Sequence, residues 1–127
     1  MIFLDSCIVI DYVNGKLTIE DSIKNNYCIN SIVDMEVCVG ARNKRELNTI
    51  NKKTSNFLSV DIDQEIMSLA SLLINQYALS HNMAVYDAII AATCMIYDLP
   101  LCTHNQKDFR YLDELNLLDS SFLKLTP

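Results

Sequence analysis

The sequence is poor in the residues that mark disordered or repetitive chains. Glycine and proline occur only twice each in 127 residues. No segment has low compositional complexity or an internal repeat, so disordered and repeat architectures are excluded. Half of the residues are hydrophobic, and a chain of this length buries roughly two thirds of its unfolded surface. These features predict one globular domain spanning residues 1–127.

Cysteine and histidine are too few and too scattered for a disulfide framework or a zinc site. The five cysteines are an odd number and form no C-x-x-C pair, and the histidines are His81 and His104 alone. Buried, reduced thiols explain this pattern better. No basic segment precedes the apolar residues at the amino terminus, and no apolar run approaches the ~20 residues of a membrane helix. We therefore expect a cytoplasmic protein that does not enter a membrane.

Basic residues are also scarce. The chain has 10 Lys and Arg against 16 Asp and Glu, a formal net charge of −6, which argues against broad electrostatic adhesion to nucleic acid. A nuclease is not excluded, because acids that bind metal contribute to this charge and a local basic strip can still steer RNA. The basic residues between 42 and 53 form such a strip, or simply a solvated helix face.

Strand-length apolar segments alternate with helical segments along the chain. Strands are expected at residues 1–4, 27–30, 57–62 and 101–103, with a final edge strand at 122–125, and helices at 6–13, 17–25, 31–50, 64–77 and 86–97. This alternation predicts a parallel α/β sandwich. Residues 88–97 include no charged side chain, so their helix should be buried on more than one side. Ser31 and Asp34 have the spacing of a capping box.

Four carboxylates fall where a shared site would need them. Asp5 follows the first expected strand, Glu36 lies early in a helix, Asp87 begins the apolar helix, and Asp108 lies in the loop after strand 101–103. Each has a structural explanation by itself, such as helix capping for Asp5 or the helix dipole for Asp87. Together they predict a site for a divalent cation, because clustered carboxylates repel one another and supply the oxygen ligands that Mg²⁺ or Mn²⁺ prefers.

The order of these motifs resembles the PIN domain family, and most closely its small VapC-type toxin ribonucleases. The resemblance covers essentially the whole chain. It rests on Ile2-Phe3-Leu4-Asp5-Ser6 with Ile10-Asp11-Tyr12, on Ser31 followed by Glu36-Val37-x-x-Gly40, on Tyr86-Asp87-Ala88-Ile89-Ile90-Ala91-Ala92-Thr93, and on Leu101-x-Thr103-x-Asn105-x-x-Asp108-Phe109. The last two segments are the most specific.

The resemblance implies a three-layer α/β/α sandwich with a mainly parallel sheet of about five strands. It also implies an endoribonuclease that uses Mg²⁺ or Mn²⁺ to hydrolyse phosphodiester bonds in tRNA or another structured RNA, a homodimer, and a VapB-like antitoxin as partner. The family's catalytic and metal-binding acids correspond to Asp5, Glu36, Asp87 and Asp108. The family's supporting hydroxyl and amide groups correspond to Ser6, Thr103 and Asn105. Asp11 also matches the family pattern, and its position on the helix after Asp5 suits a supporting hydrogen bond. His104 is a departure, because these toxins commonly carry Arg there.

The hypothesis for the chemistry is that Asp5, Asp87 and Asp108 hold the metal directly or through water, while Glu36 orients or deprotonates the attacking water. Three alternatives stay open. The chain could be a non-toxin PIN nuclease of an RNA-maturation or regulatory complex, or a non-catalytic PIN-like module that binds protein. A phosphatase or phospho-acceptor domain is disfavoured, because Cys7 stands where haloacid-dehalogenase-like enzymes place a second Asp.

Overall fold

The computed structural model describes residues 1–125, with all their side chains except those of residues 21–23, 122, 124 and 125. Its central element is a five-stranded sheet in the order β4-β3-β1-β5-β6, in which every neighbouring pair is parallel. The strands are β1 (Ile2–Leu4), β3 (Tyr27–Ile29), β4 (Leu58–Ser59), β5 (Leu101–Cys102) and β6 (Leu117–Leu118). This sheet and its helices confirm the predicted α/β/α sandwich.

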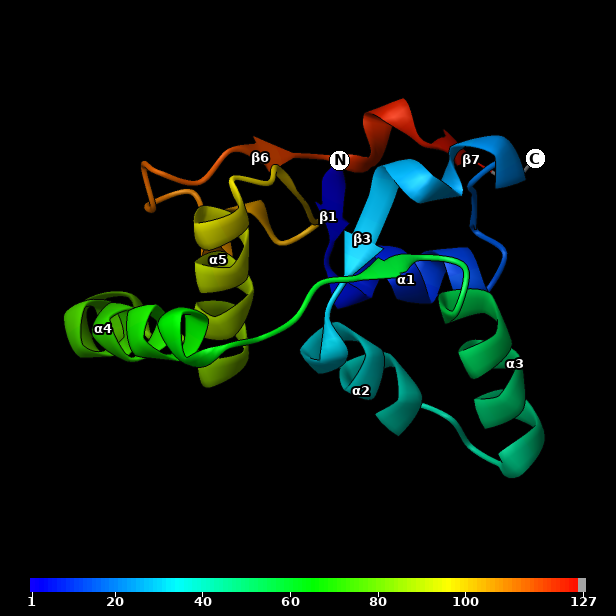
Figure 1. Ribbon diagram of the computed structural model, residues 1–127, viewed down its shortest axis with the longest axis horizontal. Coiled ribbons are helices and arrows are strands. Elements are labelled where there is room, and N and C mark those ends of the chain that lie inside the picture. The colour runs from blue at the N-terminus through cyan, green and yellow to red at the C-terminus, as the bar shows by residue number, and fades with distance from the viewer. Residues whose placement is uncertain (126–127) are drawn as a thin grey trace.

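The described residues form five α-helices, which Figure 1 shows in two groups beside the sheet. Helices α1 (Ser6–Val13), α2 (Ser31–Val39) and α3 (Lys44–Thr54) pack on one another, and α4 (Gln64–His81) packs on α5 (Val85–Tyr97). The predicted start and end of α1 are confirmed, and Gly15 follows it with the positive φ of 78° that a glycine accepts without strain. Helix α4 runs four residues past its expected end at Tyr77.

The apolar helix α5 forms the rigid centre of one half of the molecule. Residues Ala88 through Cys94 are all buried, as the lack of charged side chains predicted. Asp98 ends the helix in the left-handed conformation, and the chain then enters β5. Strand β1 lies between β3 and β5, so that Phe3 pairs with residues of both strands and is fully buried.

The helix expected at residues 17–25 does not form. The chain makes β2 (Leu17–Thr18) and then a 3₁₀ helix, η1 (Asp21–Asn26). Leu17 and Ile19 are both buried on either side of the exposed Thr18, which is the two-residue period of a strand. The final strand, β7 (Lys124–Leu125), pairs antiparallel with β2 in a separate ribbon. The prediction that it would be an edge of the main sheet is therefore wrong, and β6 is that edge.

The single helix expected at residues 31–50 is divided into α2 and α3. Gly40 ends α2, and Asn43 begins α3 by accepting a hydrogen bond from the Glu46 amide at 2.9 Å. The capping box predicted for Ser31 and Asp34 is also wrong. Asn30 caps α2 instead, since its side-chain oxygen accepts from the Val33 amide at 3.1 Å.

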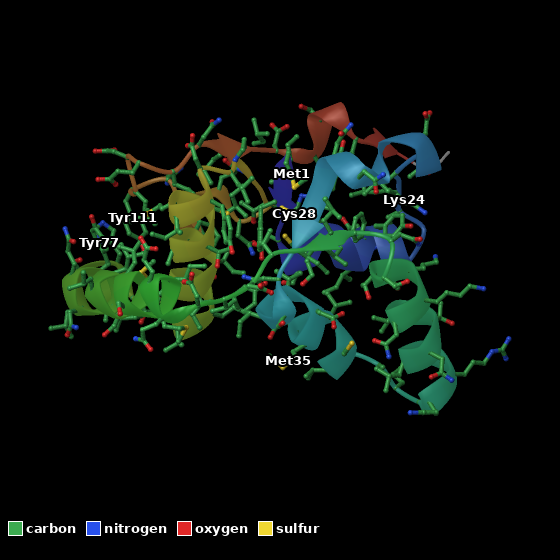
Figure 2. The ribbon with its side chains drawn as sticks, viewed as in Figure 1. Met1, Lys24, Cys28, Met35, Tyr77 and Tyr111 are labelled. Carbon is green, nitrogen blue, oxygen red and sulfur yellow. The ribbon has the colours of Figure 1, made fainter. Side chains whose placement is uncertain are left out.

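Shorter 3₁₀ helices, η2 (Gln106–Asp108) and η3 (Ser120–Phe122), complete the elements. All five cysteines are unpaired, and Cys28, Cys94 and Cys102 are buried; Figure 2 labels Cys28 on β3. Within residues 1–125, none of the helices has the length and apolar character needed to cross a membrane.

Candidate active site at the carboxyl edge of the sheet

Asp5 joins three separate segments at the end of β1. Its side chain is only 2% exposed. One carboxylate oxygen, Oδ1, accepts hydrogen bonds from the Ser6 amide at 2.7 Å and from the Tyr86 hydroxyl at 2.9 Å. The other, Oδ2, accepts from the Thr103 hydroxyl at 2.7 Å. Asp5 therefore caps α1, and it also ties the start of α5 and the end of β5 to the same point.

Asp87 lies in the first turn of α5, beside Tyr86. The pKa of Asp87 is raised to about 6, first by burial and then by the negative charges of Asp5 and Asp108. A carboxylate with this pKa is in an environment that disfavours its own charge. Two acids from other parts of the sequence thus act on Asp87, and a bound cation would relieve this repulsion.

Asp108 is exposed and lies in η2, in the loop that leaves β5. The loop is fixed through Thr103, whose hydroxyl oxygen accepts from the Asn105 amide at 3.0 Å while donating to Asp5. The side-chain amide of Gln106 donates to the carbonyls of Thr103 at 2.7 Å and Leu118 at 3.1 Å. These bonds hold the backbone before Asp108 against β5 and β6.

Glu36 is in a different environment from the other three acids. It is exposed on α2 and is not among the charges that raise the pKa of Asp87. Its part in the site stays a prediction. Among the described residues, no group of three Asp, Glu, His or Cys side chains is close enough together to ligate one ion directly. The oxygen-rich edge nevertheless suits Mg²⁺, which commonly takes one or two carboxylates and keeps several of its waters.

The neighbouring Cys7 is not suited to act as a nucleophile. The Cys7 sulfur lies 3.6 Å from the Thr103 hydroxyl and 3.9 Å from Asp5 Oδ2. Burial, and next the charge of Asp5, raise the pKa of the Cys7 thiol, which disfavours the reactive thiolate. His104 contacts Asp11, with 2.9 Å between Nε2 and Oδ2, and the supporting role of Asp11 in the site stays a prediction.

Sequence reasoning missed three residues at this edge. Tyr86 donates a hydrogen bond to Asp5, and Gln106 fixes the loop. The pKa of Tyr111 is raised mainly by burial and also by the charges of Asp87 and Asp108. Tyr86 could have been noticed as the residue before Asp87. The sequence around Gln106 and Tyr111 gives no comparable signal, because their roles depend on how the loop folds back over β5 and α4.

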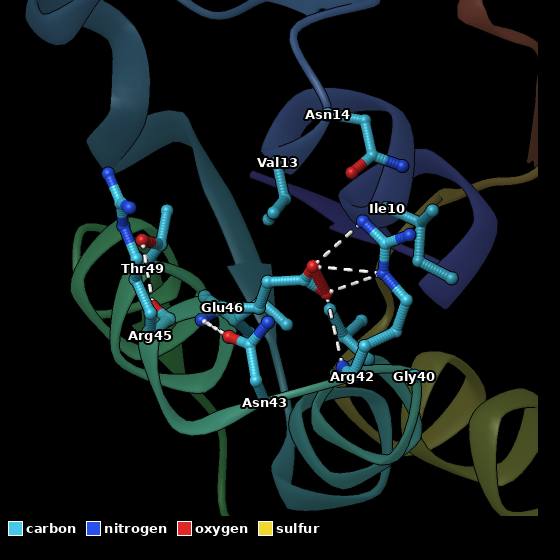
Figure 3. A pocket seen from close by; sticks show the side chains of 11 residues that line it. Ile10, Val13, Asn14, Gly40, Arg42, Asn43, Arg45, Glu46 and Thr49 are labelled. Carbon is cyan, nitrogen blue, oxygen red and sulfur yellow. Dashed lines mark hydrogen bonds and ion pairs between the residues drawn. The ribbon is translucent and has the colours of Figure 1, made fainter.

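A pocket of about 630 Å³ lies away from the acids, between α1, α2 and α3 (Figure 3). Apolar side chains and charged ones share its walls. The Arg42 guanidinium pairs with Glu46, with 3.0 Å between Arg42 Nη2 and Glu46 Oε2. Arg45 also lines the pocket. The molecule thus has an acidic edge and, separately, a concave surface with basic groups.

The chain is similar to a known protein family and to a named relative. A family model described as the PIN domain matches residues 2–115. A protein named Ribonuclease VapC from Rickettsia bellii (strain RML369-C) is 31% identical over 126 residues, covering 92% of this chain and 94% of that protein.

Solved structures give the same fold. A chain of a toxin-antitoxin complex from Klebsiella pneumoniae superposes with a TM-score of 0.72 at 26% identity, covering 93% of this chain and 96% of that one. A chain of DNA-bound VapBC from Salmonella typhimurium gives a TM-score of 0.78 at 22% identity, covering 94% and 98%.

Proposed function

Since the chain belongs to the PIN domain family, we propose that it is a metal-dependent endoribonuclease, the toxin of a VapBC-type toxin–antitoxin pair. A relative named Ribonuclease VapC, at 31% identity over nearly the whole chain, supports this activity. The proposed substrate is tRNA or another structured RNA, and the proposed location is the cytoplasm. In this proposal, residues 1–127 form one catalytic domain.

The observation that carries the proposal is the influence of two carboxylates on a third. Asp5, Asp87 and Asp108 come from β1, α5 and the loop after β5, yet the charges of Asp5 and Asp108 both raise the pKa of Asp87. Caps and dipole effects explain single acids, but they do not require three acids to approach one another. A cation site does require it.

In this proposal Asp5, Asp87 and Asp108 hold Mg²⁺ or Mn²⁺, directly or through water. When bound, such an ion acidifies a water molecule and offsets charge that builds up on the phosphate. Asp5 is held in place by hydrogen bonds from Thr103 and Tyr86, so it needs little rearrangement. Glu36 orients the attacking water or accepts its proton.

Exposed apolar side chains on two helices support the proposed protein partners. On α2, Met35 is 54% and Val39 82% exposed; on α4, Leu72 is 65% exposed and Leu79 fully so. The members of each pair share a face of their helix. Such patches commonly mark protein interfaces. We propose that a VapB-like antitoxin covers the α2 side, with its pocket, and that a second copy of the chain covers the α4 side.

The experiment that tests this function combines purified protein with expression in cells. The wild-type chain should cleave an RNA pool in Mg²⁺ or Mn²⁺ and stop when EDTA removes the metal. Its expression should arrest growth, sequencing of RNA ends should locate the cleaved bonds, and a co-expressed antitoxin should restore growth. Cleavage without growth arrest would favour a non-toxin PIN nuclease. A folded chain that cleaves no RNA with either metal would favour the non-catalytic binding module.

A further inference from the structure

Three aromatic rings gather where the carboxyl end of α4 meets the loop after η2. Tyr77 and His81 come from α4, and Tyr111 comes from the loop. The His81 and Tyr111 rings are stacked, with centroids 4.0 Å apart and planes inclined by 18°. Tyr77 packs beside both, at 5.0 Å from Tyr111 and 5.5 Å from His81. Figure 2 labels Tyr77 and Tyr111 on this side of the molecule.

The stack is graded from buried to exposed. Tyr77 and Tyr111 are half-buried, whereas His81, the last residue of α4, is exposed. A cluster that only clamps a loop to a helix gains most when all its rings are buried, since the stabilisation follows the apolar area removed from water. Here the outermost ring remains in contact with solvent, and the ring beneath it holds its plane in position.

Tyr111 connects this stack to the acids. Its hydroxyl oxygen is buried and has no hydrogen-bond partner within the described chain. Burial is the main cause that raises the pKa of Tyr111, followed by the charge of Asp87, with a smaller contribution from Asp108. Tyr111 also follows Asp108 by three residues in the same loop, so the loop carries both an acid of the proposed metal site and a ring of the stack.

Two cations lie in the same loop. Lys107 and Arg110 flank Asp108 closely in sequence, and both are exposed. Neither forms an ion pair in the described part of the chain. Unpaired bases of single-stranded RNA bind to proteins by stacking on Tyr and His rings while cations contact the phosphates. The loop and the end of α4 offer both kinds of group beside the acids.

We propose that His81 and Tyr111, supported by Tyr77, form a stacking platform for an unpaired nucleobase of the RNA, next to the bond that the acids cleave. This inference rests on the proposed ribonuclease function and adds a substrate contact to it. The ligand is a base in a single-stranded segment, because a base inside a duplex has no free face to place on the rings.

The first test maps where RNA touches the protein. Wild-type protein is mixed, in Ca²⁺ in place of Mg²⁺, with a randomised single-stranded RNA pool that carries 5-iodouridine, irradiated, digested and analysed by mass spectrometry. The platform predicts crosslinks on His81 or Tyr111. Crosslinks found only outside the segments 77–81 and 107–111, or no RNA binding at all, would overturn it.

The second test measures binding of the same RNA pool by three variants. His81→Ala should bind roughly 5- to 100-fold more weakly, the range expected for one stacked base. His81→Phe should keep most of the affinity, because it retains a flat ring. Asn116→Ala removes an exposed polar side chain from the segment that follows the loop and should bind like wild type.

A purely structural role gives a different result. If the rings only clamp the loop to α4, His81→Ala lowers the melting temperature and leaves RNA binding and KM unchanged, which would refute the platform. Failure of the proposed function is separate from this, because crosslinking and binding need no cleavage. A chain that cleaves RNA but binds equally with and without His81 refutes the platform alone. Crosslinks at His81 without cleavage support the platform and refute the nuclease.

Discussion

The two sides of this molecule carry their acids in opposite ways. On the side built by β1, α5 and β5, Asp5 is buried and Asp87 has a pKa of about 6 because burial and two neighbouring acids disfavour its charge. On the side built by α2 and α3, Glu36 is exposed. The nearby Glu46 is paired with Arg42, which holds the pKa of Glu46 below its usual range.

The difference indicates which side the fold prepares for a cation. A surface carboxylate paired with Arg needs no further partner, and such exposed pairs contribute little to stability. A half-buried carboxylate surrounded by other carboxylates is costly, so its persistence calls for a counter-charge. The β1, α5 and β5 side is therefore the metal-binding side in the proposed function, and α2 contributes Glu36 to it from the periphery.

The largest effect is expected from Asp87→Asn. Because Asp87 is a proposed metal ligand, we expect RNA cleavage to fall at least about 100-fold, more than the loss typical of groups that only support a ligand. The purified variant should keep its helical circular dichroism spectrum, since Asn has nearly the same shape. Asp113→Asn, which changes an exposed acid outside the site, should cleave like wild type. An active Asp87→Asn protein would refute the assignment.

Glu36→Gln tests whether the α2 side takes part in the chemistry. If Glu36 orients or deprotonates water, the substitution should lower kcat by about 100-fold, within the range of general acid–base groups. Because Glu36 is exposed, the melting temperature should not change. Glu65→Gln, at an exposed position on α4, is the matched control. Unchanged kcat in Glu36→Gln would confine the site to the β1, α5 and β5 side.

The same two sides differ in how far sequence predicts structure. The apolar pattern of residues 88–97 defined α5, and the strand–helix alternation defined the parallel sheet, because both depend on burial in the core. The division of residues 31–50 at Gly40 depends on a local competition that the pattern does not reveal. Asn43 supplies a good helix cap, and a second helix forms in a new direction.

The places of three candidate acids in the fold were predictable from the sequence, but the groups that contact them were not. Asp5 follows a predictable strand, Asp87 lies at the start of a predictable helix, and Asp108 lies in the loop that leaves another predictable strand. The contact across 81 residues from Tyr86 to Asp5 and the pairing of β2 with β7 depend on the folded chain as a whole. Such pairings leave little trace in short sequence windows.

The raised pKa of Asp87 gives the acid side its own pH dependence. The pKa is about 6 in the folded chain against an ordinary 3.8, so the folded state holds this proton more tightly than the unfolded state does. The penalty from ionised Asp87 is absent below about pH 4, grows as the pH rises through about 6, and is constant above that. Metal-free wild type should thus lose stability relative to Asp87→Asn over this interval.

Urea unfolding in EDTA measures this penalty at several pH values. The difference in unfolding free energy between wild type and Asp87→Asn should change by roughly 1–3 kcal/mol between about pH 4 and 7, after allowance for solvent screening at a half-buried group. Wild type should be relatively less stable at the higher pH. Saturating Mg²⁺ should reduce the difference at about pH 7, since binding stabilises the folded wild type. A difference independent of pH would contradict the environment described for Asp87.

The smallest effect is expected at the exposed edge of the acid side, where His104 contacts Asp11. Their side chains are 39% and 26% exposed, so the pair should contribute less than about 1 kcal/mol. The loop stays in place without it, because Gln106 still binds the carbonyls of Thr103 and Leu118. His104→Gln should therefore unfold within about 1 kcal/mol of wild type in urea. Gln106→Ala should lose more, since it removes the side-chain donor to the Thr103 carbonyl and one of the two donors to the Leu118 carbonyl. The reverse order would mean that the surface pair, and not the Gln106 bridge, holds the loop that carries Asp108.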